Sequence, residues 1–301
     1  MRPPIRQETR RDVLSTLPLT GVSHKYLQTL AECYCSTAKD LAWFYFDNTA
    51  ANTIRRVTSV LERLAKRGYV ETMTYQPEDP DGYRGGRLPL VFGMTGRGVS
   101  LAERHYPQLG ARELSQSRNT LEHEVKCART FFHFVKMCEQ NGFEAHCQRA
   151  DLYRRVDKDS YIDPDWLFAA YHPRTDRTKY FFLELENEKK NFRKLDEKFA
   201  PYQKLHGTEE CLRQWGDFSE FTVIIQFANQ ERHDNFRAYL AGECRCTSYR
   251  GRLRHTCRPS APLKCKTFWL TTDADIWSRI SGRIFTTPAD YACASYSFLD
   301  P

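Results

Sequence analysis

One amphipathic segment, residues 52–67, constrains the fold of this chain more than any other feature. Apolar residues recur there at spacings of three and four, which predicts a helix with one buried stripe, ended by Gly68. The stripe consists of Ile54, Val57, Leu61 and Leu64. The opposite, polar face carries Asn52, Thr53, Arg55, Arg56, Ser59 and Arg63. These side chains are donors suited to phosphate oxygens and to base edges in a major groove, so we expect this face to bind DNA.

Two strand-like runs follow this helix, and further helices surround it. β-Branched and aromatic residues predict strands at 69–75 and 88–92, separated by a turn-rich tip that contains Arg84 and Arg87. Helices are expected at 6–17, from a Ser23 cap to about 33, at 37–46, and from a Thr95 cap to about 106. This order is typical of a winged helix-turn-helix, so residues 1–110 are interpreted as a winged-helix DNA-binding domain. The alternative is a protein-binding module of the same fold.

Composition is that of an ordinary globular protein. The chain has 301 residues, of which 41% are hydrophobic and 28% charged, enough for two domains with cores of their own. The apolar run at 221–228 is far shorter than the ~20 residues that span a bilayer. No apolar segment follows the basic N-terminus, as it would in a signal peptide. We therefore expect a cytoplasmic protein with reduced cysteines and no membrane partner.

Residues 111–301 alternate between helix-like and strand-like segments. A long helix is expected at 119–140, with Glu124 at the edge of its apolar face. Strand-like runs follow at 143–152, 161–170, 179–186, 221–227 and 266–270, with helices at 192–206 and 232–241, and residues 273–280 are expected to close the fold. Strands separated by helices predict an α+β or α/β fold, a mixed sheet flanked by helices, with functional residues at one end.

Acidic side chains are paired in two of the expected strands. Strand alternation puts Glu184 and Glu186 on one side, while Asp163 and Asp165 flank Pro164. A proline there fits only an edge, a bulge or the disrupted end of a strand. Carboxylate oxygens are the ligands that Mg²⁺ prefers. We expect Asp165 and Glu184, with Glu124 from the preceding helix, to converge at one end of the sheet.

These residues also carry a resemblance to known families. Pro164-Asp165 followed by Glu184-Leu185-Glu186, after a helix bearing Glu124, resembles the PD-(D/E)XK nuclease superfamily. The segments LEHEV (121–125), IDPDWLF (162–168) and FFLELENEKKN (181–191), with Lys198 and Tyr202, resemble the replication-relaxation family of plasmids and integrative conjugative elements. In that family a winged helix precedes such a core. The resemblance implies a PD-(D/E)XK nuclease-like domain at 111–301 that holds Mg²⁺ or Mn²⁺ at Asp165 and Glu184.

One position departs from the superfamily pattern. The lysine that usually follows the glutamate by two residues is here Glu186. Some members carry glutamate there, and others move the lysine to the next helix, where Lys198 lies one turn before Tyr202; Lys189, Lys190 and Lys194 are weaker substitutes. The resemblance thus implies Asp165, Glu184, Glu186, Lys198 and Glu124 as the catalytic set. Two functions stay open: a metal-dependent DNA endonuclease or nickase, and a non-catalytic DNA-binding initiator or transcriptional regulator with a degenerate nuclease fold.

Residues 242–266 form a basic, cysteine-rich insertion outside this resemblance. Seven basic residues and no acidic one occur from Cys244 to Lys266, which is typical both of a segment that binds a polyanion and of a solvated basic loop. Four thiols have spacings that allow a structural Zn²⁺, with free thiols as the alternative. They are Cys244, Cys246, Cys257 and Cys265. The partners expected for the whole chain are double-stranded DNA, other replication or mobilisation proteins, and a second copy of the chain in a homodimer.

Overall fold

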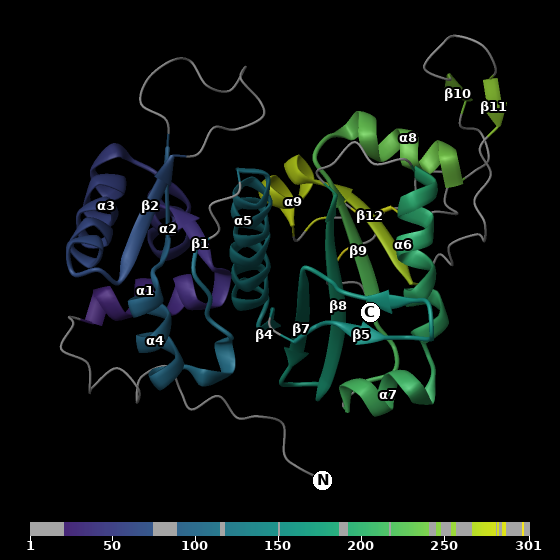
Figure 1. Ribbon diagram of the computed structural model, residues 1–301, viewed down its shortest axis with the longest axis horizontal. Helices are drawn as coiled ribbons and strands as arrows, with labels where there is room; N and C mark the ends of the chain where they lie inside the picture. Colours follow the sequence, from purple (N-terminus) through teal and green to yellow (C-terminus); the bar gives the residue numbers. More distant parts are fainter. Residues whose placement is uncertain are drawn as a thin grey trace. The chain divides into compact units, whose positions relative to one another are not determined.

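The amphipathic helix expected at 52–67 is α3 (Ala51–Lys66), which belongs to the first of two units in the computed structural model (Figure 1). The units are Met1–Arg129 and Thr130–Pro301. The division falls within helix α5 (Arg118–Gln140), whereas the domain boundary at residue 110 stays a prediction. The structure describes residues 21–74, 89–114, 118–149, 151–186, 192–216, 218–240, 245–247, 254–256, 267–280, 282, 285–286 and 297.

The first unit combines helices with a three-stranded antiparallel sheet. Its described helices are α1 (Gly21–Cys33), α2 (Ala38–Phe46), α3, α4 (Gly96–His105) and the short 3-10 helix η3 (Pro107–Leu109). The strands are β1 (Cys35–Thr37), β2 (Val70–Thr74) and β3 (Leu90–Met94), with β3 between the other two. Strand β1 was not expected from the sequence. The buried stripe of α3 includes Val60 as well as Val57, Leu61 and Leu64, while Ile54 is only half-buried.

Local signals set several ends of these helices. The Thr37 hydroxyl accepts a hydrogen bond from the Asp40 N–H at the start of α2, and Thr95 accepts one from Gly98 at the start of α4. Gly68, with a positive φ of 74°, follows α3. The predicted Ser23 cap is wrong, because α1 begins at Gly21 and Ser23 is buried within its first turn. The helix expected at 6–17 lies outside the described residues.

The second unit is built on a five-stranded mixed sheet in the order β12-β9-β8-β7-β4. Its strands are β4 (Glu144–Gln148), β7 (Trp166–His172), β8 (Arg177–Glu186), β9 (Thr222–Phe227) and β12 (Phe268–Thr272). Strands β8, β9 and β12 run parallel, whereas β7 is antiparallel to both β8 and β4. Helices α6 (Phe192–Leu205), α7 (Glu209–Trp215) and α8 (Gln230–Leu240) follow, and α9 (Asp273–Arg279) succeeds β12.

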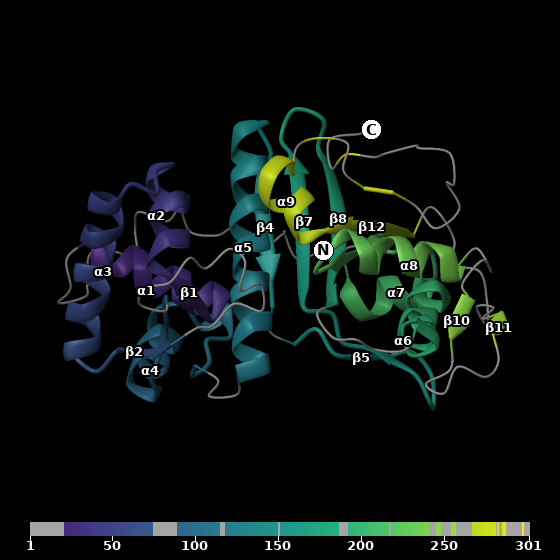
Figure 2. The same ribbon diagram turned by 90° about the horizontal axis from the view of Figure 1, so that it is seen from above.

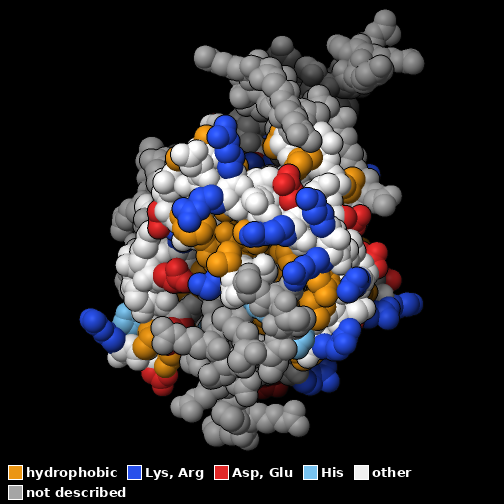
Figure 3. Space-filling model, turned by 90° about the vertical axis from the view of Figure 1, so that its left-hand side faces the viewer, with side chains coloured by type: hydrophobic (Ala, Val, Ile, Leu, Met, Phe, Trp, Pro, Cys, Tyr) orange, Lys and Arg blue, Asp and Glu red, His pale blue; other side chains and the backbone are white. Residues whose placement is uncertain are grey.

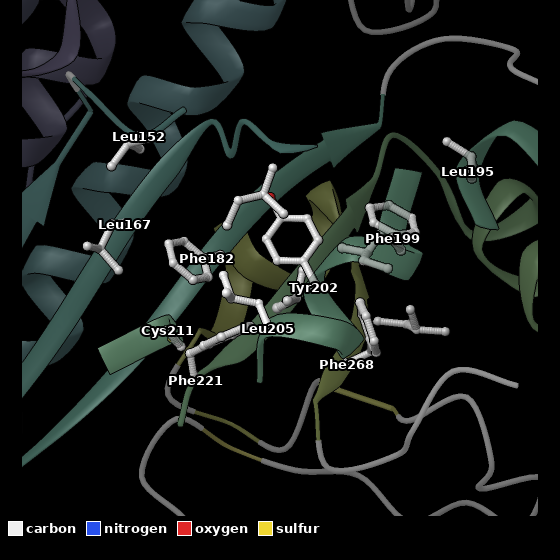
Figure 4. Close-up of a cluster of buried hydrophobic side chains, with 14 of the residues drawn as sticks. Leu152, Leu167, Phe182, Leu195, Phe199, Tyr202, Leu205, Cys211, Phe221 and Phe268 are labelled. Carbon is white, nitrogen blue, oxygen red and sulfur yellow. The ribbon is translucent and has the colours of Figure 1, made fainter. Parts of the chain in front are cut away.

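Each face of this sheet packs against helices (Figure 2). On one face, Phe134 of α5 stacks on Phe168 of β7 with ring centroids 4.4 Å apart. On the other, α6, α7 and α8 cover a large apolar core, in which Tyr202 lies between Phe182 and Phe199 (Figure 4). Burial of these aromatic rings is the main favourable term for the unit. The expected mixed sheet flanked by helices is therefore confirmed. None of the described helices is long and apolar enough to cross a membrane.

Two expected strands are shorter than their composition indicates. The run 161–170 is divided into β6 (Tyr161–Ile162) and β7, because the chain leaves the ladder around Pro164, which has no N–H to donate. The run 143–152 ends at Gln148, and Asp151 turns the chain with a φ of 57°. After this turn β5 (Arg154–Arg155) pairs with β6 as a separate two-stranded sheet. Helix α7, which begins at the Thr208 cap, was not expected.

Candidate functional site

The pairing of β7 with β8 holds Asp165 against the end of β8. Trp166 is opposite Leu183, so Asp165 directly precedes the point where the two strands meet. The Asp165 N–H donates to the Leu183 carbonyl at 3.0 Å, and the Leu185 N–H donates to Asp165 Oδ2 at 2.7 Å. These two hydrogen bonds place the Asp165 carboxylate beside the residues on either side of Glu184.

Helix α6 brings a lysine and a tyrosine to the two glutamates of β8. The Lys198 Nζ lies 2.6 Å from Glu184 Oε2 and 2.7 Å from Glu186 Oε1. The Tyr202 hydroxyl donates a short hydrogen bond to Glu184 Oε1. Residues four apart share a helix face, which is why Lys198 and Tyr202 both point to the same strand. Both glutamates are almost completely buried.

Burial and charge shift the pKa values of this group in different directions. Burial is the largest influence on Glu184 and raises its pKa; Lys198 opposes this effect and Asp165 adds to it. Burial alone would lower the pKa of Lys198, but the carboxylates of Glu184, Glu186 and Asp165 outweigh it and raise that pKa above its ordinary value. Lys198 is therefore a fixed ammonium at neutral pH, because its neighbours stabilise the charged form.

We call Asp163, Asp165, Glu184 and Glu186 the carboxylate cluster. Most of the Asp163 side chain is exposed. Its carboxyl group is still partly desolvated, and this desolvation and the charge of Asp165 raise its pKa, while Lys198 acts to lower it. A second cation, Arg232 of α8, interacts electrostatically with Glu186 while its guanidinium packs over the Phe192 ring at 4.4 Å. Four carboxylates thus face two cations, and the cluster has a surplus of negative charge when all are ionised.

This donor set fits a hard divalent cation. Asp165 and Glu184 offer carboxylate oxygens from neighbouring strands, and the surplus negative charge would be relieved by Mg²⁺ or Mn²⁺. The predicted residues Asp165, Glu184, Glu186 and Lys198 are brought together at one end of the sheet. Whether they form a catalytic centre stays a prediction.

Glu124 is held by different partners. It lies on α5 in the first unit, is buried, and forms a short ion pair with Arg112. The Arg112 guanidinium also stacks on the Tyr34 ring at 3.9 Å. The expected convergence of Glu124 with the carboxylate cluster of the second unit stays a prediction.

The polar face of α3 is open to solvent. Asn52, Arg55, Arg56, Ser59 and Arg63 are exposed, and Thr53 is half-buried. Lys66 and Arg67 extend this face, and Glu62 is the acidic residue of the helix. Figure 3 looks onto the side where α3 lies and shows Lys and Arg side chains spread across it, with few acidic ones. Arg84 and Arg87 lie outside the described residues, as do the substitutes Lys189 and Lys190, while Lys194 is exposed on α6.

The cysteine-rich insertion is described only in part. A short hairpin pairs β10 (Arg245–Thr247) with β11 (Arg254–Thr256), which places Cys246 on a strand. Cys244, Cys257 and Cys265 lie outside the described residues. The Zn²⁺ site stays a prediction.

Two features of the cluster were not predicted. The hydrogen bond from Tyr202 to Glu184 had a signal, because Tyr202 follows Lys198 by four residues. No sequence signal indicated that Arg232 approaches Glu186, because this contact depends on how α8 packs against α6.

Comparison with known proteins gives one result. A family model described as Replication-relaxation matches residues 27–220, more than half of the chain. The matched segment includes α3 and the whole carboxylate cluster with Lys198, and it ends before the basic insertion. No curated protein and no solved structure matches the chain.

Proposed function

We propose that this chain, which belongs to the replication-relaxation family, binds double-stranded DNA and cuts one strand at the carboxylate cluster. That family has a role in the replication or relaxation of plasmids and other mobile elements. The observation that carries this proposal is the position of Lys198, whose ammonium contacts Glu184 and Glu186 next to Asp165. The PD-(D/E)XK resemblance requires a lysine and two acids at one end of a sheet. Here the lysine comes from α6 instead of β8.

Each residue of the cluster then has a defined task. Asp165 and Glu184 would hold Mg²⁺ or Mn²⁺, which when bound polarises the phosphate and lowers the pKa of an attacking water. Lys198 supplies a fixed positive charge that stabilises the negative charge developing on the phosphate. Glu186 and Glu184 hold the ammonium in place, and Tyr202 orients Glu184 through its hydroxyl. Arg232 offsets part of the charge of Glu186.

The first unit supplies the proposed DNA contacts. Its element order, α1-β1-α2-α3-β2-β3, supports the winged-helix interpretation, in which α3 is the recognition helix and β2 and β3 are the base of the wing. The exposed cations of α3 support contacts to phosphates and base edges.

Nicking of supercoiled plasmid in Mg²⁺ or Mn²⁺ tests the catalytic proposal. We expect open circles with the wild type and none with Asp165→Ala or Glu184→Gln, while DNA binding stays nearly intact. Asp176→Asn is the matched control, because it removes an exposed carboxylate of the same unit at a position with a φ of 52°, which asparagine tolerates. Nicking that persists in both cluster variants would identify a contaminating nuclease and overturn the proposal.

Mobility shifts over a salt series test DNA binding by α3. Charge reversal of Arg55 and Arg56 should weaken binding by about 1–3 kcal/mol for each lost contact and reduce the salt slope. The control reverses Arg174 and Arg177, two exposed cations of the second unit. Equal losses in both double variants would show only a general charge effect and contradict a role for α3.

A non-catalytic initiator or regulator is the second candidate. It is favoured by one observation, that both oxygens of Glu184 already have partners, Tyr202 and Lys198. In that case the cluster is an internal ion-pair network, and the protein binds DNA without cutting it. Wild-type protein that shifts DNA but leaves plasmid supercoiled in both metals would establish this alternative.

A further inference from the structure

Two tyrosines near the carboxylate cluster are unusually open to solvent. Tyr153 and Tyr161 are 54% and 57% exposed, more than any other large hydrophobic side chain in the part of the chain that the structure describes. Their ring centroids are 5.1 Å apart, so the two rings form one aromatic surface. Adjacent exposed rings offer π-faces on which another flat ring can stack.

The pairing of β5 with β6 explains why both rings face solvent. Arg155 is opposite Tyr161, and Arg154 is opposite Ile162. Leu152 and Ile162 belong to the core beneath α6, so strand alternation turns Tyr153 and Tyr161 to the outer face. Packing of Leu152 and Ile162 in the core therefore fixes the position of the hairpin that carries the two tyrosines.

Neither guanidinium group of this hairpin forms an ion pair with a carboxylate in the part of the chain that the structure describes. The Arg155 guanidinium donates to the main-chain carbonyls of Asp157 and Lys158 at 3.0 and 2.6 Å. Arg154 donates to the Tyr153 carbonyl at 2.8 Å and stacks over Trp215. The carboxylate of Asp157 instead pairs with Lys204, at 2.8 Å. Asp151 and Asp159, also exposed, are the other acids of the segment. By the same alternation Arg155 is on the face of the tyrosines, whereas Arg154, opposite Ile162, is on the face that packs against Trp215.

The hairpin leads directly into the carboxylate cluster. Tyr153 directly precedes β5 and Asp163 directly follows β6, so the two residues are at the same end of this antiparallel pair. The Asp163 carboxylate interacts electrostatically with Asp165 and Lys198. A ligand that contacts the tyrosine pair is therefore at the end of the hairpin from which the chain continues into the cluster.

We propose that Tyr153 and Tyr161 form a stacking platform for unpaired bases of the DNA strand whose backbone lies at the carboxylate cluster. Bases of an intact duplex are stacked on each other and offer no face to the rings, whereas unpaired bases of any sequence do. The Arg155 guanidinium on the same face favours a polyanionic strand over an apolar peptide. This inference rests on the proposed function and names its substrate class: DNA with a single-stranded segment, such as a melted, gapped or branched site.

The test compares two DNA probes on the full-length protein in EDTA, where no cutting takes place. One probe is a duplex with a single-stranded arm that carries 2-aminopurine next to the junction; the other is the fully paired duplex of the same sequence. Tyr153→Leu with Tyr161→Leu should weaken binding of the junction probe about tenfold or more and abolish the change in 2-aminopurine fluorescence, with duplex binding unchanged.

Two further variants identify stacking as the cause. Tyr153→Phe with Tyr161→Phe keeps the rings and should bind the junction like the wild type. Leu212→Ala, which truncates another exposed apolar side chain of the same unit, should have no effect. The proposal is overturned if the leucine variant binds the junction normally, if it loses duplex binding equally, or if the phenylalanine variant also fails. Because all readouts are binding without metal, a failure of nicking leaves this test unaffected, and its own failure leaves the nicking assay intact.

Discussion

Replacing Lys198 with methionine should expose the energetic role of the carboxylate cluster. The side chains of Glu184 and Glu186 are each only 1% exposed, and both lie within 2.7 Å of the Lys198 ammonium. Methionine keeps the length and apolar stem of lysine but removes the charge. Removing one partner of a buried ion pair costs about 3–5 kcal/mol. Because the Lys198 side chain is itself 33% exposed, water screens part of this effect, and we expect a loss of about 3 kcal/mol.

Urea unfolding followed by tryptophan fluorescence measures this loss. Four of the five tryptophans lie in the second unit, so the signal reports mainly on the unit that contains the cluster. For a domain of this size, about 3 kcal/mol corresponds to a fall in melting temperature of about 6–12 °C. An unchanged slope with a lower midpoint would show that the folded state, and not the compactness of the unfolded chain, has changed.

Two additions to this experiment separate charge from packing. Adding Glu184→Gln and Glu186→Gln to the Lys198→Met variant removes the uncompensated carboxylates and should restore most of the stability. Mn²⁺ should raise the midpoint of Lys198→Met more than that of the wild type, because the cation replaces the missing ammonium. A midpoint that Lys198→Met leaves unchanged, or a loss that the two glutamines do not recover, would refute the reasoning.

Two buried histidines give further predictions. Among the described residues neither ring nitrogen of His24, fully buried in α1, has a hydrogen-bond partner. His24→Leu should therefore raise the free energy of unfolding of the first unit by about 1–2 kcal/mol, and with it the urea midpoint; a lower midpoint would contradict this. Burial lowers the pKa of His233, and Asp234 only partly opposes it. The unfolded chain then takes up the proton more readily, so stability falls as the pH drops below the ordinary value of about 6.5. His233→Gln cannot titrate and should lose less stability than the wild type between about pH 7.5 and about pH 5.5, and equal losses would assign the pH dependence to other groups.

Features with a strong local periodicity could be predicted from the sequence. The helix expected at 52–67 is α3 at Ala51–Lys66, and the strand expected to end at residue 186 is β8, which ends there. Alternation along β8 correctly put Glu184 and Glu186 on one face, because the side-chain period of a strand does not depend on its partners. The same reasoning failed for residues 161–170. Their composition suits a strand, but Pro164 interrupts the ladder, and Tyr161 pairs with Arg155 instead of continuing into β7.

Contacts between distant elements could be predicted only in part. The spacing of Lys198 and Tyr202 indicated one helix face, but the two ion pairs of Lys198 also require α6 to pack at a particular height along β8. That height is set by the core around Phe199 and Leu205, which no local pattern specifies. For the same reason the sequence could not show that Arg232 approaches Glu186.

Position 186 is a glutamate where the PD-(D/E)XK pattern has a lysine. This difference alters the charge balance of the whole cluster and is more than the loss of one lysine. With glutamate on the strand and no other change, the cluster would hold four carboxylates without an ammonium, which burial makes very unfavourable. Lys198 restores the ammonium from α6, and Glu186 gives it a second anchor. An ammonium held by two buried carboxylates has little freedom to reorient, so in the proposed nuclease its charge would be in place before a phosphate binds. The proposed catalytic role of the cluster therefore depends on Lys198 and does not require a lysine at position 186.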